Sequence, residues 1–157
     1  MKKTAFIFSI IAALVMFAGC KSSRTPITAE EFITKAEAAG YTVQDSMDQL
    51  AQEVVEGYLI AYKEDDDADV KFQIEFVTVS TVEQAKAAYT ENYNTFKAKK
   101  GSSYSESSVK LGNYAHYKLT SGGRYYVISR TETTFVYIDA DSEYKGEIVE
   151  FLKDIGY

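Results

Sequence analysis

The chain of 157 residues contains no tryptophan, one cysteine, one histidine and one proline. With Cys20 as its single thiol it can form no internal disulfide, so the domain has to be stable through its core. One histidine, His116, and one cysteine cannot supply a set of zinc ligands. A Ser-His-Asp arrangement would have to use this same histidine, and the sequence contains no nucleophile elbow. The net charge of −6 argues against nucleic-acid binding, which needs a basic surface. We therefore expect no metal, no cofactor, no catalytic set and no nucleic-acid partner.

The first 20 residues form a targeting pattern. Lys2 and Lys3 precede an uncharged, mostly apolar run over residues 4–18. That run is shorter than the roughly 20 residues of a spanning helix and is typical of a secretory signal peptide. Its end, "FAGC", places two small residues directly before Cys20 and resembles the lipobox of bacterial lipoproteins.

The lipobox resemblance implies that Cys20 receives a diacylglyceryl group and becomes the first residue of the mature protein. It predicts a signal peptide over 1–19, a lipidated cysteine with a short tether over 20–27, and a globular domain over 28–157. Two acyl chains hold a protein on a bilayer where one holds it only marginally. Loss of residues 1–19 removes two lysines and no acid, which takes the net charge from −6 to −8. The expected location is extracytoplasmic, on the cell membrane or on an outer membrane if the host has one.

Helix signals occur three times along the domain. Thr28 with Glu31, and Ser80 with Glu83, have the spacing of capping boxes, in which each side chain caps the other's backbone N–H. Apolar residues at helical spacing follow both pairs and recur near the C-terminus. The expected helices span residues 28–40, 80–101 and 142–155.

Strand signals fill most of the remaining chain. The segment "VKFQIEFVTV" (70–79) alternates apolar with polar residues, and with "VVEGYLIAYK" (54–63) it predicts an antiparallel hairpin around an acidic turn. The segments "YAHYKLT", "RYYVISR" and "TFVYIDA", separated by tight turns, predict a meander. Together they predict a single α+β domain, in which about three helices pack on an antiparallel sheet. The order of elements resembles the Mog1/PsbP-like sandwich, and that resemblance carries no functional residues over.

The acidic turn Asp65–Asp69 has carboxylates at alternate positions, like the start of a calcium loop. Val70 stands where that loop needs glycine and Phe76 where it needs a bidentate glutamate. A solvated hairpin tip is the favoured interpretation, and weak calcium binding is the alternative.

Tyrosine is abundant, with 13 in the chain. Alternation along 114–120 places Ala115 with Tyr117 and Leu119 on one side, which we expect the helices to cover. The other side then carries an exposed face of aromatic and basic residues, the types enriched at binding hot spots. The residues of this expected binding face are Tyr114, His116, Tyr126 and Arg130.

These features favour a membrane-anchored, non-enzymatic binding or interaction module, whose partner is an envelope protein or a small ligand. One alternative is an inhibitory or structural envelope lipoprotein that uses the acidic turn as its contact. A more remote alternative is a carboxylate-based hydrolase with Glu56 and Glu75 as an acid–base pair, which requires a suitable separation and a cleft.

Overall fold

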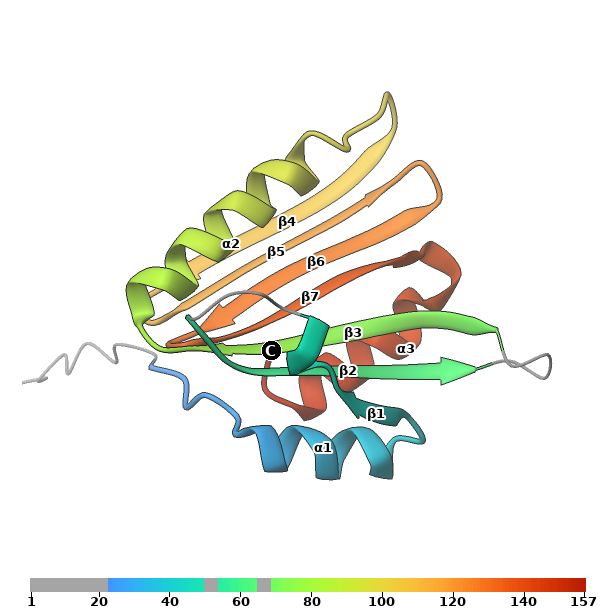
Figure 1. The fold of residues 1–157 in the computed structure, drawn as a ribbon. Helices are drawn as coiled ribbons and strands as arrows, with labels where there is room; N and C mark the ends of the chain where they lie inside the picture. Colours follow the sequence, from blue (N-terminus) through green and yellow to red (C-terminus); the bar gives the residue numbers. More distant parts are fainter. Residues whose placement is uncertain (1–22, 50–53, 65–68) are drawn as a thin grey trace, which may run out of the picture.

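The computed structural model describes residues 23–49, 54–64 and 69–157, and its centre is one seven-stranded antiparallel sheet. In chain order the strands are β1 (Thr42–Asp45), β2 (Val55–Glu64), β3 (Val70–Val79), β4 (Tyr104–Leu111), β5 (Tyr114–Ser121), β6 (Arg124–Thr131) and β7 (Thr134–Asp141). Across the sheet the order is β1-β2-β3-β7-β6-β5-β4, so the last strand of the meander returns to pair with the hairpin (Figure 1). The predicted α+β class, with a hairpin and a meander, is confirmed.

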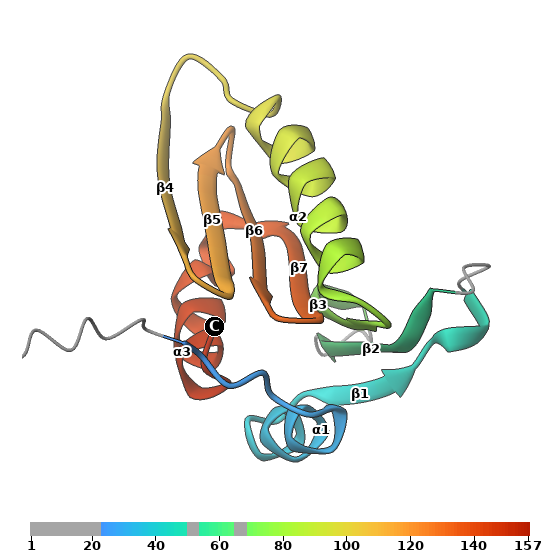
Figure 2. The same ribbon diagram turned by 90° about the vertical axis from the view of Figure 1, so that its left-hand side faces the viewer.

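Helices cover both faces of this sheet. They are α1 (Ala29–Ala38), α2 (Val82–Lys97) and α3 (Lys145–Asp154), with short 3₁₀ turns η1 (Met47–Gln49) and η2 (Ser142–Tyr144). Figure 2 shows α2 on one side of the meander strands and α3 on the other. One buried cluster joins α1 and α3 to the sheet through Phe32, Phe76 and Phe151, and a second joins α2 through Phe96 and Tyr117. We call these two sides the α3 face and the α2 face.

The helix ends follow local sequence signals, with one correction. The capping box of Thr28 and Glu31 is present as predicted. At α2 the cap is Thr81, whose hydroxyl accepts from the backbone N–H of Gln84, so the predicted Ser80–Glu83 box is wrong by one residue. Both registers contain a hydroxyl residue followed three residues later by Glu or Gln, and Ser80 instead bonds the Val54 carbonyl. The last helix begins at Lys145, after the 3₁₀ turn.

The chain joins the domain earlier than the sequence predicts. Ile27 is buried in the core, and Arg24 is already hydrogen-bonded to the domain. Asn113 in the β4–β5 turn accepts from the Arg24 backbone N–H at 3.0 Å and donates to the Arg24 carbonyl at 2.7 Å. The chain therefore joins the fold at Arg24, although the sequence predicted a tether through residue 27.

Candidate functional site

The binding face expected from alternation is wrong. Tyr114 and His116 are each 4% exposed, Tyr126 is 7% exposed and Arg130 is 2% exposed. They also do not share a face, because the β5–β6 register pairs Ala115 with Arg130 and His116 with Ser129. Tyr114 and His116 thus point to the α3 face, whereas Tyr126 and Arg130 point to the α2 face.

Each half of that set has a structural partner. The guanidinium of Arg24 lies 3.6 Å from the centre of the Tyr114 ring. Tyr126 packs on Phe96 of α2 with ring centres 5.0 Å apart, and Arg130 donates to the Glu132 carbonyl at 3.1 Å. Burial, with Lys118 and Arg24 as neighbouring cations, lowers the pKa of His116 to about 3. These side chains consequently build the core and do not offer a surface for a partner.

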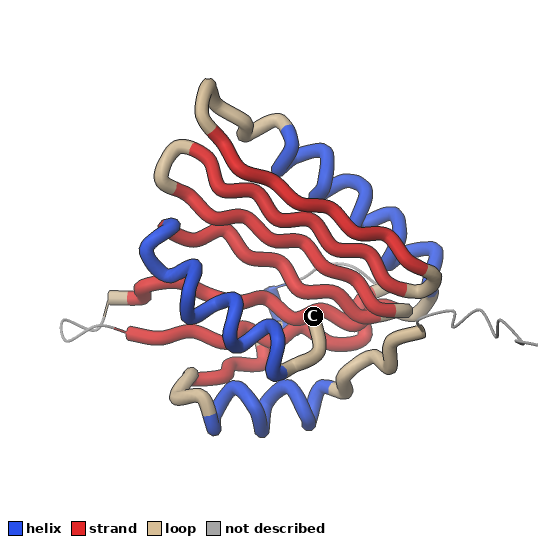
Figure 3. The backbone as a smooth tube through the Cα atoms, turned by 180° about the vertical axis from the view of Figure 1, so that it is seen from behind, coloured by secondary structure: helices blue, strands red, loops and turns tan. Residues whose placement is uncertain are grey.

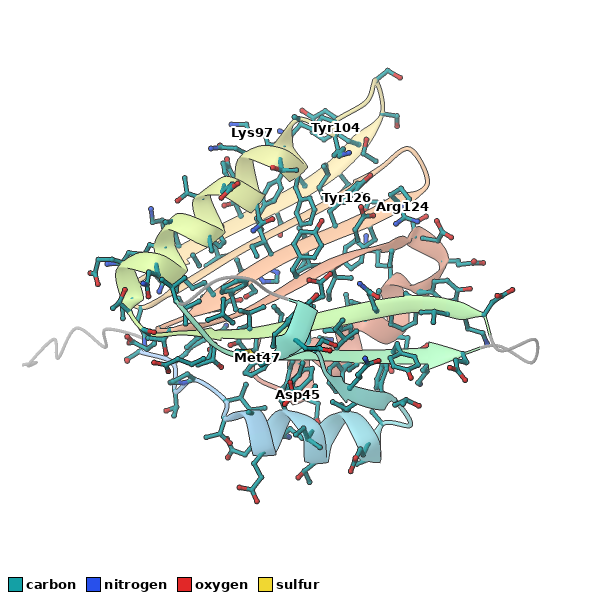
Figure 4. All side chains as sticks on the ribbon, viewed as in Figure 1. Asp45, Met47, Lys97, Tyr104, Arg124 and Tyr126 are labelled. Carbon is teal, nitrogen blue, oxygen red and sulfur yellow. The ribbon has the colours of Figure 1, made fainter. Side chains whose placement is uncertain are left out.

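The α2 face has a recess between α2 and strands β3 and β7. It has a volume of about 330 Å³ and is lined by Glu75, Asn92, Phe135 and Tyr137. Figure 4 looks onto this face of the sheet, where Tyr126 lies beside α2 and Arg124 lies at the end of β6. The recess is open to solvent and combines aromatic walls with two polar side chains. We call this the α2-side recess.

Glu75 is the polar centre of the recess. It sits on an internal strand, opposite Ile60 of β2 and Tyr137 of β7. Its carboxylate accepts from the Tyr58 hydroxyl at 3.0 Å and from the Gln73 amide at 3.1 Å. Since an ionised carboxylate has about four acceptor sites, two remain for a ligand. Burial and then the Glu75 charge raise the pKa of Tyr58, so its hydroxyl keeps the proton that it donates.

The other walls complete a mixed surface. Asn92 donates its amide to the Ala88 carbonyl at 2.9 Å, which fixes the side chain and leaves its carbonyl as an acceptor. Tyr137 is half-buried and packs on Phe96 at 4.9 Å between ring centres. The arrangement suits a ligand group that has an apolar side flanked by hydrogen-bond donors and acceptors.

The sequence pointed to Glu75 only as half of an acid–base pair, and it gave no sign of Asn92 or Tyr137 as neighbours. The backbone positions of this proposed pair, Glu56 and Glu75, are well separated. Ile60, opposite Glu75, lies four residues beyond Glu56 on β2, about 13 Å along the strand. Paired glycosidase carboxyls lie about 5–9.5 Å apart, so the two glutamate side chains would have to close this backbone separation before they could act together.

The sequence also bears on metal binding and on the membrane, and some of the residues concerned lie outside the described part of the chain. Among the described residues no group of three or more His, Cys, Asp or Glu is placed to hold a metal ion. Cys20 and positions 65–68 of the acidic turn lie outside the described residues. Within the described ranges no helix has the length and apolar character needed to cross a bilayer.

Comparison of the chain with protein-family models, with curated proteins and with solved structures finds no match. What can be stated of its class is the fold: an antiparallel α+β domain with helices on both faces of one sheet.

Proposed function

We propose that this chain is an extracytoplasmic lipoprotein whose domain binds a protein partner or a small ligand without transforming it. The observation that supports binding is the α2-side recess, where an oriented carboxylate lies beside two aromatic side chains. The pattern that supports anchoring is the apolar run that ends in "FAGC".

Binding is tested by partner capture with the full chain in native membranes. Glu75→Gln keeps the shape of the side chain and removes its charge, so it should weaken crosslinking to the partner several-fold. Glu91→Gln is the matched control, since this exposed residue precedes Asn92 on α2 and loses the same charge. The readout is the crosslinked partner by mass spectrometry, together with small ligands retained by the purified protein.

Equal capture by the wild-type chain and Glu75→Gln would remove the recess from the proposal. A wild-type chain that retains neither a protein nor a small ligand would overturn binding altogether.

Anchoring is tested at the thiol. Cys20→Ala should abolish incorporation of a fatty-acid label and leave an uncleaved precursor, because the acceptor sulfur is gone. The precursor is detected by its slower migration on a gel. A variant of normal size that still carries the lipid label would refute the anchor.

A further inference from the structure

Four cations gather on the α3 face, although the chain as a whole is acidic. They are Arg24, Lys118 of β5, and Lys145 and Lys153 of α3. Burial lowers the pKa of Lys118, and the nearby positive charges of Lys153 and Lys145 lower it further. Lys145 also donates to the Thr120 hydroxyl of β5 at 3.2 Å. The two helix lysines are eight residues apart, about 12 Å along α3. We call these four residues the basic strip.

The strand surface beside the strip has no negative side chain. Alternation and the β4–β5 register place eight residues of these two strands on the α3 face. They are Ser105, Ser107, Val109, Leu111, Tyr114, His116, Lys118 and Thr120. Val109 is 41% exposed and Leu111 is 53% exposed, so apolar groups lie at the surface next to the strip. In Figure 3 the outer strands continue beyond α3 with no helix over them.

The strip lies where the chain enters the domain. Besides its bonds to Asn113, Arg24 donates through Nη1 to the Gly156 carbonyl at 2.9 Å. Arg24 and Lys153 line a surface recess of about 460 Å³ together with Thr25 and the C-terminal residues Gly156 and Tyr157. From Cys20 to Arg24 the chain can extend at most about 14 Å. A lipid on Cys20 would therefore hold this part of the domain at the bilayer.

We propose that the basic strip, with Val109 and Leu111, is a membrane-docking surface for the anionic phospholipid headgroups of the bilayer. The proposal rests on the lipid anchor proposed above. Lysine and arginine side chains near an anionic surface are attracted to it, whereas the acidic remainder of the domain is repelled. The two effects together select one orientation, with the α3 face toward the lipid. The α2-side recess, on the opposite face of the sheet, then opens away from the bilayer.

The test uses the full lipidated chain in vesicles, with one fluorophore on an introduced cysteine. Ser107→Cys places the label on the α3 face of β4, and Ser108→Cys places it one residue further, on the opposite face. The vesicles contain phosphatidylcholine alone or an equimolar mixture with phosphatidylglycerol, and each carries a lipid with a nitroxide on its headgroup. In the anionic vesicles the label at 107 should be quenched more strongly than the label at 108, and in phosphatidylcholine the two should differ less.

Charge variants then identify the residues responsible. Lys118→Gln, Lys145→Gln and Lys153→Gln should each lower the ratio of docked to undocked protein by about fivefold. The triple strip variant combines these three substitutions. Its control combines Lys86→Gln, Lys97→Gln and Lys99→Gln, exposed lysines on or just after α2, and removes the same charge. Leu111→Ser should weaken docking more than Val70→Ser, since both parent side chains are 53% exposed and only Leu111 adjoins the strip.

Equal quenching at 107 and 108 in anionic vesicles, or a triple strip variant that behaves like its control, would overturn the docking surface and leave the anchor intact. A wild-type chain that does not float with any vesicle would overturn both. Circular dichroism of each variant confirms that the comparison is between folded proteins.

Discussion

The lone histidine shows how burial changes the role of a residue. On an exposed strand row His116 would titrate near its ordinary pKa of 6.5, but here it is 4% exposed and stacks with Tyr114 at 6.0 Å between ring centres. Its neighbours Lys118 and Arg24 are cations, so proton uptake in the folded state is opposed by burial and by charge. The imidazole is therefore neutral at physiological pH and belongs to the core.

This burial makes His116 a source of acid sensitivity. The pKa of about 3 in the folded chain lies below the ordinary 6.5, so between these values the unfolded chain binds the proton that the folded chain does not. Above about pH 6.5 the neutral His116 costs no free energy of unfolding. As the pH decreases below that value, the free energy of unfolding should fall, by at most about 1.4 kcal/mol per pH unit from this residue. Urea unfolding at several pH values should show a shallower fall for His116→Gln. Parallel curves for the wild-type chain and the variant would contradict the prediction.

At the scale of elements, the edge of the sheet contrasts with its middle. Every residue of the edge strand β4 is exposed, whereas β6 is buried at all positions but Arg124. A strand covered on both faces loses the polar row that marks a half-buried strand, as the run "YYVIS" in β6 does. That is why the sequence prediction placed Tyr126 and Arg130 on the wrong face.

The start of α2 gives a direct test at this scale. Thr81→Ala removes the hydroxyl that accepts from Gln84 N–H at 3.2 Å and should reduce the free energy of unfolding by about 1 kcal/mol. Ser80→Ala should cost less, within about 0.5 kcal/mol, since Ser80 is exposed and its hydroxyl makes only a 3.3 Å bond. Urea denaturation followed by circular dichroism measures both variants. A larger loss for Ser80→Ala would favour the capping register predicted from the sequence.

At the scale of the whole molecule, the two buried clusters share one sheet. Residues of β6 alternate between them, with Tyr125 and Val127 in the α3-face cluster and Tyr126 and Ile128 in the α2-face cluster. Loss of packing on one face thus removes support from strands that the other face also needs. The domain should unfold as one cooperative unit.

Matched truncations on the two faces test this cooperativity. Phe32→Ala and Phe96→Ala each remove a ring that is 0% or 1% exposed, and each should cost about 3–5 kcal/mol. Both should move the whole urea transition to lower urea, with coincident curves from far-ultraviolet circular dichroism and tyrosine fluorescence. A Phe96→Ala chain that loses the two signals in separate steps would show that the faces unfold independently.

Local signals in the sequence determined the elements of this protein. The capping box at Thr28, the alternation around Ile74 and the glycine pair Gly122–Gly123 each act within a few residues, so helix, strand and turn could be predicted there. The hairpin, the meander and the α+β class followed from their order along the chain.

Only the tertiary structure decided which surfaces are free. Alternation assigns neighbouring residues to opposite sides of a strand, but the cover on each side comes from helices far along the chain. Thus Phe96 of α2 packs on Tyr126 and Arg24 packs on Tyr114, which were expected to bind a partner. The pairing of β3 with β7 brings Glu75 beside Tyr137, and α2 adds Asn92. The basic strip arises in the same way, because Arg24, Lys118 and Lys153 are distant in sequence and meet only when α3 packs on the sheet.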